Sequence, residues 1–388
     1  MLYRRRGALL AAFLGSVTAA SAPLSDRPSF AHAAERPTFV RPTGCAAPPE
    51  LAAVCCAKDA PDEDGDGVGD ACEQALAERY APIVYHSTDE SNFPTNVDAF
   101  LPETHLGAFD LDCADDAAKS IATHPTQADL ASRTWRPPCG SGADVRAAGT
   151  RSVGKHRSFF LADVPEPVRA GSSDTTAWTT YFHAYPNDVG GITIQYWRFY
   201  AYNDALNDHG GDWEGLHVVT DPSLQISSLR LLAHSELRDL PRSRFTFEGT
   251  HVHVFSEGGG HATRFSGDEI AARGCNHLGR CVIDLDEPAT FVRQETWPGG
   301  QVRDARGVRG KTGALVNLGA KTSPMNGQSF VQYSGMWGSP GMLYSTSGYW
   351  GPAFNETGMR ADGFLSAWCE GIVSKNLKEE CFPVTTSP

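Results

Sequence analysis

Short runs of β-branched and aromatic residues, separated by clusters of Gly, Pro and Asp, dominate the second half of the chain. Examples are GITIQYWRFYAY, GLHVVTD, ISSLRLLAHS, THVHVFS and FVQYS. Runs of this kind at this spacing predict a mainly antiparallel β-sandwich. The run Ala81–Tyr85 predicts the first strand of this domain. Short helices are expected at 74–80, 268–273 and 363–370, so the predicted fold class is mainly β.

Two other kinds of segment interrupt the strand pattern. From about 102 to 174 the periodicity is weak and prolines are frequent, which predicts loops around short strands. The segments 299–324 and 334–355 are glycine-rich and aromatic. We expect these two segments to be long loops laid over a sheet face.

The first 33 residues have the pattern of an export signal. MLYRRRGALLAAFLGSV combines a basic start with a short apolar run, and small residues near Ala20 and Ala33 offer two cleavage positions. Residues 34–49 read as a linker, 50–75 as a cysteine-rich calcium loop and 76–388 as the β-sandwich domain. No later apolar run reaches the roughly 20 residues needed to cross a bilayer, so we expect a secreted or cell-surface protein without a transmembrane segment.

Ten cysteines in an exported chain predict disulfides rather than zinc or redox sites. Adjacent cysteines cannot readily pair with each other, so Cys55 and Cys56 are expected to take Cys45 and Cys72, in either combination. The other expected pairs are Cys113 with Cys139, Cys275 with Cys281, and Cys369 with Cys381.

An acidic loop, DEDGDGVGDACE, follows the cysteine-rich piece. Counted from Asp62 as position 1, acids occupy positions 1, 3, 5, 9 and 12, with a glycine at 6 and a backbone carbonyl at 7. This is the ligand spacing of a calcium loop, and six acids with no base would otherwise crowd like charges. A solvated acidic linker is the alternative. The predicted Ca²⁺ ligands are Asp62, Asp64, Asp66, the Val68 carbonyl, Asp70 and Glu73.

A second candidate site is HGGDWEG, residues 209–215. If a strand opens at Asp212, alternation places Asp212 and Glu214 on one face and Trp213 in the core. His209, one Gly-Gly turn earlier, can reach the same face, and Asp204 can supply a further oxygen. Two carboxylates and one imidazole suit Ca²⁺ or Mg²⁺ better than zinc. The alternative is that both acids cap turns or pair with arginines.

Histidines downstream add one more candidate. His261 follows three glycines that allow a sharp turn, which would let its side chain reach a site on a neighbouring strand. His251 and His253 share one strand face and read as ordinary strand residues. The segment ARGVRGKT, residues 305–312, fits a loose phosphate-loop pattern but lacks a surrounding strand–loop–helix unit.

Several motifs in succession resemble a known family. RYAPIVYHSTDESNFPTNVDAFL, FHAYPN, GGITIQYWRFYAYND, HGGDWEGLHVV, EGTHVHVFSEGGGHATRF and YWGPAFNETG are similar to the vacuolar protein sorting-associated protein 62 family. The resemblance runs from about Tyr80 to Gly358. It implies the fold of that family without implying an activity. The calcium loop resembles a thrombospondin type 3 repeat.

A more distant likeness concerns HGGDWE. It resembles the GHRHDWE signature of necrosis- and ethylene-inducing peptide 1-like proteins, secreted cytolysins that bind a divalent cation and membrane sphingolipid glycans. The resemblance implies metal ligands at His209, Asp212 and Glu214, with Asp204 and His261 as looser matches. Gly210 and Gly211 depart from that signature.

These features predict a secreted, divalent-metal-dependent binding protein whose ligand is a glycan or a membrane lipid headgroup. A metal-dependent hydrolase, in which Glu214 or His261 moves a proton, is the alternative of a different class. A third possibility is a structural surface protein stabilised by calcium. We expect binding rather than catalysis, because the carboxylates of the site are used by the metal. The net charge of −13 disfavours nucleic acid as a partner.

Overall fold

The computed structural model describes residues 47–88, 90–110, 119–132, 134–135, 145–146, 157–187, 189–204, 208–233, 236–265, 291–339 and 350–352. All of them fall within the unit Pro37–Pro388. The predicted signal region, most of the linker and the helices expected at 268–273 and 363–370 lie outside the described residues.

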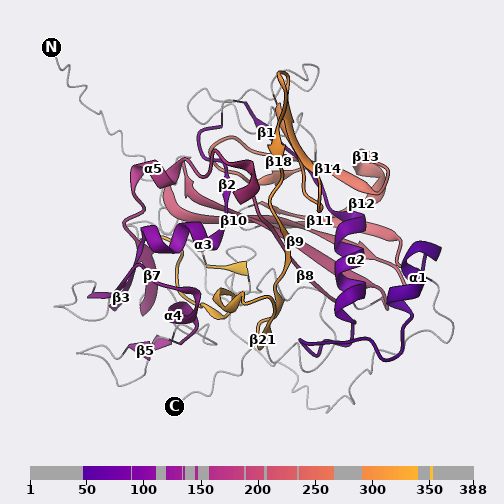
Figure 1. Cartoon of the computed structure of the whole chain (residues 1–388), viewed down its shortest axis with the longest axis horizontal. Coiled ribbons are helices and arrows are strands. Elements are labelled where there is room, and N and C mark those ends of the chain that lie inside the picture. The colour runs from indigo at the N-terminus through magenta and orange to yellow at the C-terminus, as the bar shows by residue number, and fades with distance from the viewer. Residues whose placement is uncertain are drawn as a thin grey trace, which may run out of the picture. The chain divides into compact units, whose positions relative to one another are not determined.

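The predicted runs GITIQYWRFYAY, GLHVVTD and ISSLRLLAHS lie in a seven-stranded central sheet with the order β12-β11-β10-β9-β8-β19, and β2 pairs with β9 (Figure 1). The run FVQYS was wrongly expected to be a strand, because Ser329–Gln332 form a 3-10 turn. β9 and β10 are the longest strands of the central sheet, with 12 residues each. Nearly every residue of both strands is buried, as expected for a sheet covered on both faces. The strands are β2 Pro94–Thr95, β8 Thr180–Pro186, β9 Ile192–Asn203, β10 His209–Thr220, β11 Ile226–Ala233, β12 Glu236–Pro241 and β19 Leu315–Asn317.

A second seven-stranded sheet, the front sheet, has the order β13-β14-β1-β16-β17-β18, and β15 pairs with β14. Its valines Val84, Val252 and Val254 share one hydrophobic cluster with Tyr196 and Leu216 of the central sheet. The two sheets therefore pack face to face, and the predicted mainly β class is confirmed. The strands are β1 Ile83–Ser87, β13 Phe247–Glu248, β14 His251–Ser256, β15 Thr263–Arg264, β16 Phe291–Glu295, β17 Gln301–Asp304 and β18 Gly307–Lys311.

The opposite face of the central sheet is covered by a three-stranded sheet, β4-β3-β7, which comes from the region where the sequence pattern is weak. Leu106 and Phe159 of this small sheet join Phe199 and Trp213 of the central sheet in a second cluster. The protein thus has a third layer beyond the expected sandwich. The strands of this sheet and of two minor ribbons are β3 His105–Asp110, β4 Lys119–Thr123, β7 Arg157–Ala162, β5 Thr134–Trp135, β6 Val145–Arg146, β20 Gly319–Ala320 and β21 Ser323–Pro324.

Strand pairing is mainly antiparallel, as expected. Two pairs are parallel, β1 with β14 and β8 with β19. Within the central sheet, each pair of neighbouring strands from β8 to β12 is antiparallel. One expectation was wrong: residues 299–324 are not a long loop, because 301–311 form the hairpin β17–β18. Gly307 takes φ 120 at its turn, and a Cβ on Gly310 would lie 2.4 Å from Thr175 Oγ1. Gly307 therefore serves the turn of the hairpin, and Gly310 allows the hairpin to approach Thr175 of η3.

Helices are short, and the longest described one, α2, packs against the central sheet, where Leu76 and Tyr80 share a cluster with Tyr196. The helix expected at 74–80 is present, but α2 starts one turn earlier, so Asp70 and Glu73 belong to it. Its acidic first turn suits the positive end of the helix dipole. No helix in the described ranges is both long and apolar enough to span a membrane. The helices are α1 Pro49–Cys55, α2 Asp70–Tyr80, α3 Val97–Phe100, α4 Gln127–Ser132 and α5 Glu166–Arg169, with 3-10 turns η1 Leu101–Glu103, η3 Thr175–Ala177, η4 Arg242–Arg244 and η6 Ser329–Gln332.

Candidate metal centres

The acidic loop folds so that three of its carboxylates converge. The ligand atoms of Asp62, Asp64 and Asp66 all lie within 4.8 Å of one another, so this group could hold a metal ion. Asp62 accepts the backbone N–H groups of Gly65 at 2.8 Å and Gly67 at 3.0 Å, which fixes the turn around it. Positive φ values at both glycines allow this tight path. We call this group, with Glu73, the loop centre.

Burial disfavours the ionised form of two carboxylates of the loop centre, those of Asp64 and Glu73. Asp64 is 7% exposed, and burial, with Asp62 nearby, raises its pKa to about 7. Glu73 is fully buried, and burial followed by the charges of Asp66 and Asp64 raises its pKa well above the ordinary value. Asp64 Oδ2 and Glu73 Oε1 are buried without a hydrogen-bond partner among the described residues. A cation held by Asp62, Asp64 and Asp66 would satisfy Asp64 Oδ2 and reduce the repulsion of Glu73 by Asp66 and Asp64.

The remaining predicted loop ligands have structural contacts. Asp70 Oδ1 accepts the Glu63 N–H at 2.9 Å, which closes the loop at its base. The Val68 side chain is buried, and its N–H donates to Asp66 Oδ1 at 2.7 Å. Glu73 Oε2 accepts a hydrogen bond of 2.8 Å from Asn317 Nδ2 in β19. Asp70 and Val68 stay predictions as ligands.

A disulfide fastens α1 to α2 beside this loop. Cys55 bonds to Cys72, so the expectation that Cys72 pairs with one of the adjacent cysteines is confirmed. Cys56 is also disulfide-bonded. Cys45 and the pairs expected among Cys113, Cys139, Cys275, Cys281, Cys369 and Cys381 lie outside the described residues.

The second candidate site is built on β9 and β10. Register places Asp212 opposite Tyr200 and Glu214 opposite Arg198, on the face toward the front sheet. Trp213 points to the other face, where it joins the core, as alternation predicts. The Gly-Gly pair is not a turn before the strand, because β10 already begins at His209.

Gly211 instead bends the strand from within. It has φ 58, and a Cβ there would lie 2.3 Å from the Trp337 carbonyl oxygen. A side chain at this position would therefore meet both strain and a clash. His209, two residues before this position, interacts electrostatically with the Asp212 carboxylate.

Asp212 and His261 meet directly. His261 Nδ1 lies 2.9 Å from Asp212 Oδ2, and its Nε2 lies 3.8 Å from Glu90 Oε1. The ring also stacks on Tyr200 at 3.8 Å between centroids. The predicted turn before His261 is present, since its N–H donates to the Glu257 carbonyl at 2.7 Å and its φ is 55.

The electrostatics of this contact favour an imidazolium ion between carboxylates. Burial alone would lower the pKa of His261, but Asp212 and Glu90 raise it well above its usual value. Burial alone would raise the pKa values of Asp212 and Glu90, yet the interaction with His261 holds both below their usual range. The site therefore already requires one positive charge between its acids.

Glu90 was missed by the sequence analysis. Its Oε1 accepts the N–H groups of Ser91 and Asn92, each at 2.9 Å, and its Oε2 accepts the Gly259 N–H at 2.9 Å. It thereby ties the segment after β1 to the glycines before His261. The acid-containing STDES segment directly after a predicted strand was the available signal.

Glu214 lies deeper in the interface between the sheets. It is 4% exposed, and its Oε2 has no hydrogen-bond partner among the described residues. Burial and then the Asp212 charge raise its pKa well above the usual value. Arg198 is fully buried on the neighbouring strand and donates from Nη2 to Thr263 Oγ1 at 2.8 Å. We call Asp212, Glu214, His209 and His261, together with Glu90, the strand centre.

Two of the predicted ligands, His209 and Asp204, differ in how exposed they are. His209 is buried, and burial lowers its pKa, so the ring is neutral and able to act as a nitrogen ligand. Asp204 is exposed at the end of β9, and its N–H donates to the Gly259 carbonyl at 2.8 Å. Among the described residues, the ligand atoms of Asp62, Asp64 and Asp66 form the group of three that lie within 4.8 Å of one another, so the structure does not bring the residues of the strand centre together in this way.

Comparison with known proteins gives structural neighbours of low similarity. No family model matches the chain, and no curated protein matches it. Necrosis and Ethylene inducing Protein 2 from the causal agent of cocoa's Witches Broom disease is 15% identical, with 49% of this chain and 67% of that chain covered and a TM-score of 0.27. A structure described as a toxin fold for microbial attack and plant defense is 14% identical, with 50% of this chain and 67% of that chain covered and a TM-score of 0.28. NLPPya in complex with glucosamine is 18% identical, with 24% and 48% covered and a TM-score of 0.22. At these values the similarities carry no argument about what this chain binds.

Proposed function

We propose that this protein is an exported binding protein that depends on divalent cations at two centres. Ca²⁺ occupies the loop centre and stabilises the fold. Ca²⁺ or Mg²⁺ occupies the strand centre and takes part in recognising a glycan or a lipid headgroup. The observation that carries the proposal is the contact of 2.9 Å between Asp212 and His261, beside a buried Glu214 that has an unpaired oxygen.

The donors of the strand centre are of the kinds that a hard cation uses, and binding would require them to move closer together than in the cation-free structure. In the cation-free protein, His261 supplies the positive charge that its acidic neighbours require. A divalent cation would provide that charge, with Asp212 and Glu214 as oxygen ligands and His209 and His261 as nitrogen ligands. Carboxylate oxygens are the ligands that Ca²⁺ and Mg²⁺ prefer.

The same geometry disfavours the hydrolase alternative. A general base needs an atom within hydrogen-bonding reach of the substrate. His261 is 0% exposed, so neither of its ring nitrogens is within reach of a substrate in solution. The purely structural alternative explains the loop centre, but it leaves the buried charges of the strand centre without a role.

Calorimetry of the full chain with Ca²⁺ and Mg²⁺ tests the proposal. Two binding events are expected in the natural protein, and Asp212→Asn with Glu214→Gln should remove one of them. The matched control, Asp98→Asn with Glu103→Gln, neutralises two exposed acids and should retain both. An unchanged isotherm for the Asp212 and Glu214 variant would refute the strand centre.

Binding to sphingolipid-containing vesicles and to immobilised glycans tests recognition. We expect cation-dependent binding to one of the two, with loss in EDTA and in the same double variant. Turnover of a phosphoester or glycan that disappears with EDTA would instead identify an enzyme.

A further inference from the structure

The hairpin β17–β18 is basic, although the chain as a whole is acidic. Between 301 and 311 it carries Arg303, Arg306, Arg309 and Lys311 against one acid, Asp304, whereas the chain has a net charge of −13. Figure 1 shows the hairpin in orange as the uppermost ribbon of the view. At physiological ionic strength exposed charges are screened beyond about 8 Å, so a local group of cations acts independently of distant acids.

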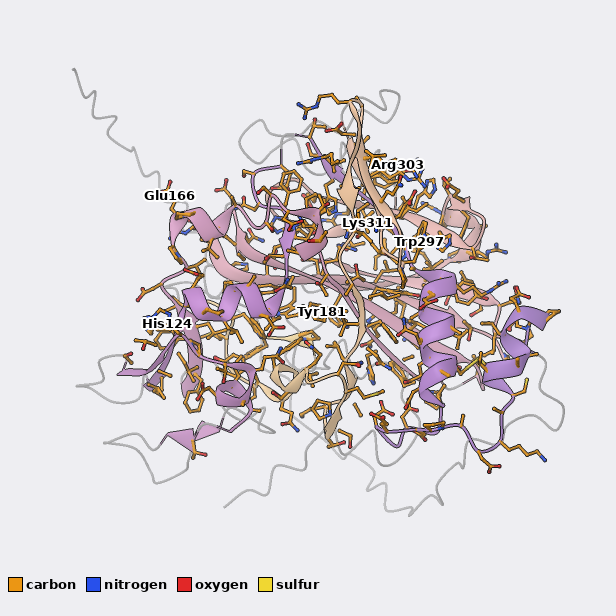
Figure 2. All side chains as sticks on the ribbon, in the orientation of Figure 1. His124, Glu166, Tyr181, Trp297, Arg303 and Lys311 are labelled. Atoms are coloured by element: carbon orange, nitrogen blue, oxygen red, sulfur yellow. A yellow bond between two sulfur atoms is a disulfide. The ribbon has the colours of Figure 1, made fainter. Side chains whose placement is uncertain are left out.

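Its side chains are open to solvent. The Arg306 side chain is 90% exposed, and Lys311 and Arg309 are exposed as well. Val308, between them, is 60% exposed and is one of two large hydrophobic residues exposed to this degree in the described ranges. Register pairs Val308 with Arg303, so an apolar side chain stands among basic ones. Figure 2 labels Arg303 and Lys311 on this ribbon.

Neighbouring acids offset the basic charge in part. Arg303 pairs with Glu295 at 3.0 Å and Arg306 with Asp304 at 3.2 Å. In both pairs the arginine is the exposed partner, at 45% and 90%, whereas the carboxylates of Glu295 and Asp304 are only 9% and 5% exposed, so the guanidinium groups still face solvent. Arg309 lies over the rings of Phe93 and Trp178, at 5.4 and 5.8 Å from their centroids, which holds the base of the hairpin in place.

We propose that this hairpin docks onto the anionic phospholipid headgroups of a membrane surface. Arg306 and Lys311 attract the phosphates, and Val308 enters the interfacial region between them. Basic residues attract anionic bilayers, and apolar side chains add affinity by burial at the interface. An acidic polysaccharide would use the cations but would offer nothing to Val308, so lipid is the occupant that explains both.

β18 is also the edge of the front sheet. Charged residues on edge strands prevent pairing with other chains, which accounts for arginine and lysine at this position. That role does not account for Val308, because an exposed hydrophobic residue on an edge promotes association. Membrane docking accounts for both the basic residues and the exposed Val308.

The proposed docking is independent of the cation centres. Arg309 lies over Phe93, which follows the Glu90 segment of the strand centre closely in the chain. The hairpin and the strand centre are therefore linked through one segment, yet the hairpin itself needs no metal. Binding measured in EDTA reports the hairpin alone, so its failure is distinct from failure of the proposed cation function.

Cosedimentation of the full chain with vesicles in EDTA tests the inference. The vesicles are phosphatidylcholine alone, or phosphatidylcholine with about one third phosphatidylserine. We expect binding to the second kind only. Arg306→Gln with Lys311→Gln should weaken it about 30-fold, the effect of two cations near an anionic surface. Val308→Ser should weaken it about fivefold through lost apolar burial.

The matched control is Lys58→Gln with Arg242→Gln, which removes the same charge from exposed positions outside the hairpin and should bind as the natural protein does. Equal binding by the Arg306 and Lys311 variant, or no binding to phosphatidylserine vesicles, would overturn the proposal. Binding to heparin that depends on Arg306 and Lys311, without vesicle binding, would also overturn it in favour of an acidic polysaccharide.

Discussion

Replacing Asp64 and Glu73 together by Asn and Gln should abolish the stabilisation of the protein by calcium. In EDTA the natural protein holds two buried carboxylates near Asp62 and Asp66. The double variant removes this crowding while keeping the shape of both side chains, so we expect it to be at least as stable. With calcium present, the natural protein should become the more stable of the two.

The expected magnitude follows from the kind of site. Extracellular calcium modules have dissociation constants of roughly 0.1 to 1 mM. At about 10 mM calcium, a ligand that binds only the folded state then adds about 1.4 to 2.7 kcal/mol to the free energy of unfolding. The variant should gain close to nothing, because the oxygens of Asp64 and Glu73 are the buried, unpaired ones.

Urea unfolding followed by tryptophan fluorescence measures this difference, since Trp197 and Trp213 lie in the core. Unfolding curves are compared in EDTA and in calcium for the natural protein and the double variant. Glu63→Gln is the matched control, because this exposed acid lies in the same loop and outside the ligand spacing. The control should keep the calcium increment. The same increment in the double variant would refute the loop centre.

Two further predictions concern the strands around the strand centre. Burial, followed by the Arg198 charge, lowers the pKa of His86 to about 3. The unfolded chain therefore binds the proton first, and stability is lost as pH falls below about 6.5; at pH 5 the share of His86 in this loss is about 2 kcal/mol. In urea titrations His86→Asn should reduce the loss by that amount, while His183, whose pKa burial also lowers to about 3, keeps its own share. Gly211→Ala should lower the unfolding free energy by about 3 kcal/mol or more, because of its positive φ and its clash with Trp337. Gly210→Ala, whose Cβ would lie 3.1 Å from its nearest neighbour, should cost clearly less, and equal losses would contradict this explanation.

The parts of the fold that could be predicted depend on local periodicity. Alternation along 209–220 is enough to separate Trp213 from Asp212 and Glu214, and the structure has this arrangement. The third layer could not be predicted in this way. Its strands β3 and β7 are separated by more than 45 residues, and each is too short to show a clear alternation of apolar and polar residues. Their pairing is set by contacts with the central sheet.

The same distinction applies to the two centres. The loop centre lies within twelve consecutive residues, so spacing was enough to indicate the converging carboxylates of Asp62, Asp64 and Asp66, although it also predicted Asp70 and Glu73, which lie outside this group. The strand centre joins Glu90, Asp212 and His261, which are 49 residues or more apart. Nothing in the sequence between these residues indicates that they are in contact. Glu90 could have been recognised only as an acid next to a strand end.

The loop centre and the central sheet share one core, which is why a single unfolding curve can report calcium binding. Leu76 and Tyr80 of α2 belong to the cluster that includes Tyr196. The Tyr196 hydroxyl donates to the Ala77 carbonyl at 2.9 Å, and Asn317 of β19 donates to Glu73. A cation that relieves Glu73 therefore stabilises a helix bonded to two strands of the central sheet. Because β9 also carries Arg198 and Tyr200 of the strand-centre interface, free energy gained at the loop stabilises the strand on which that centre is built.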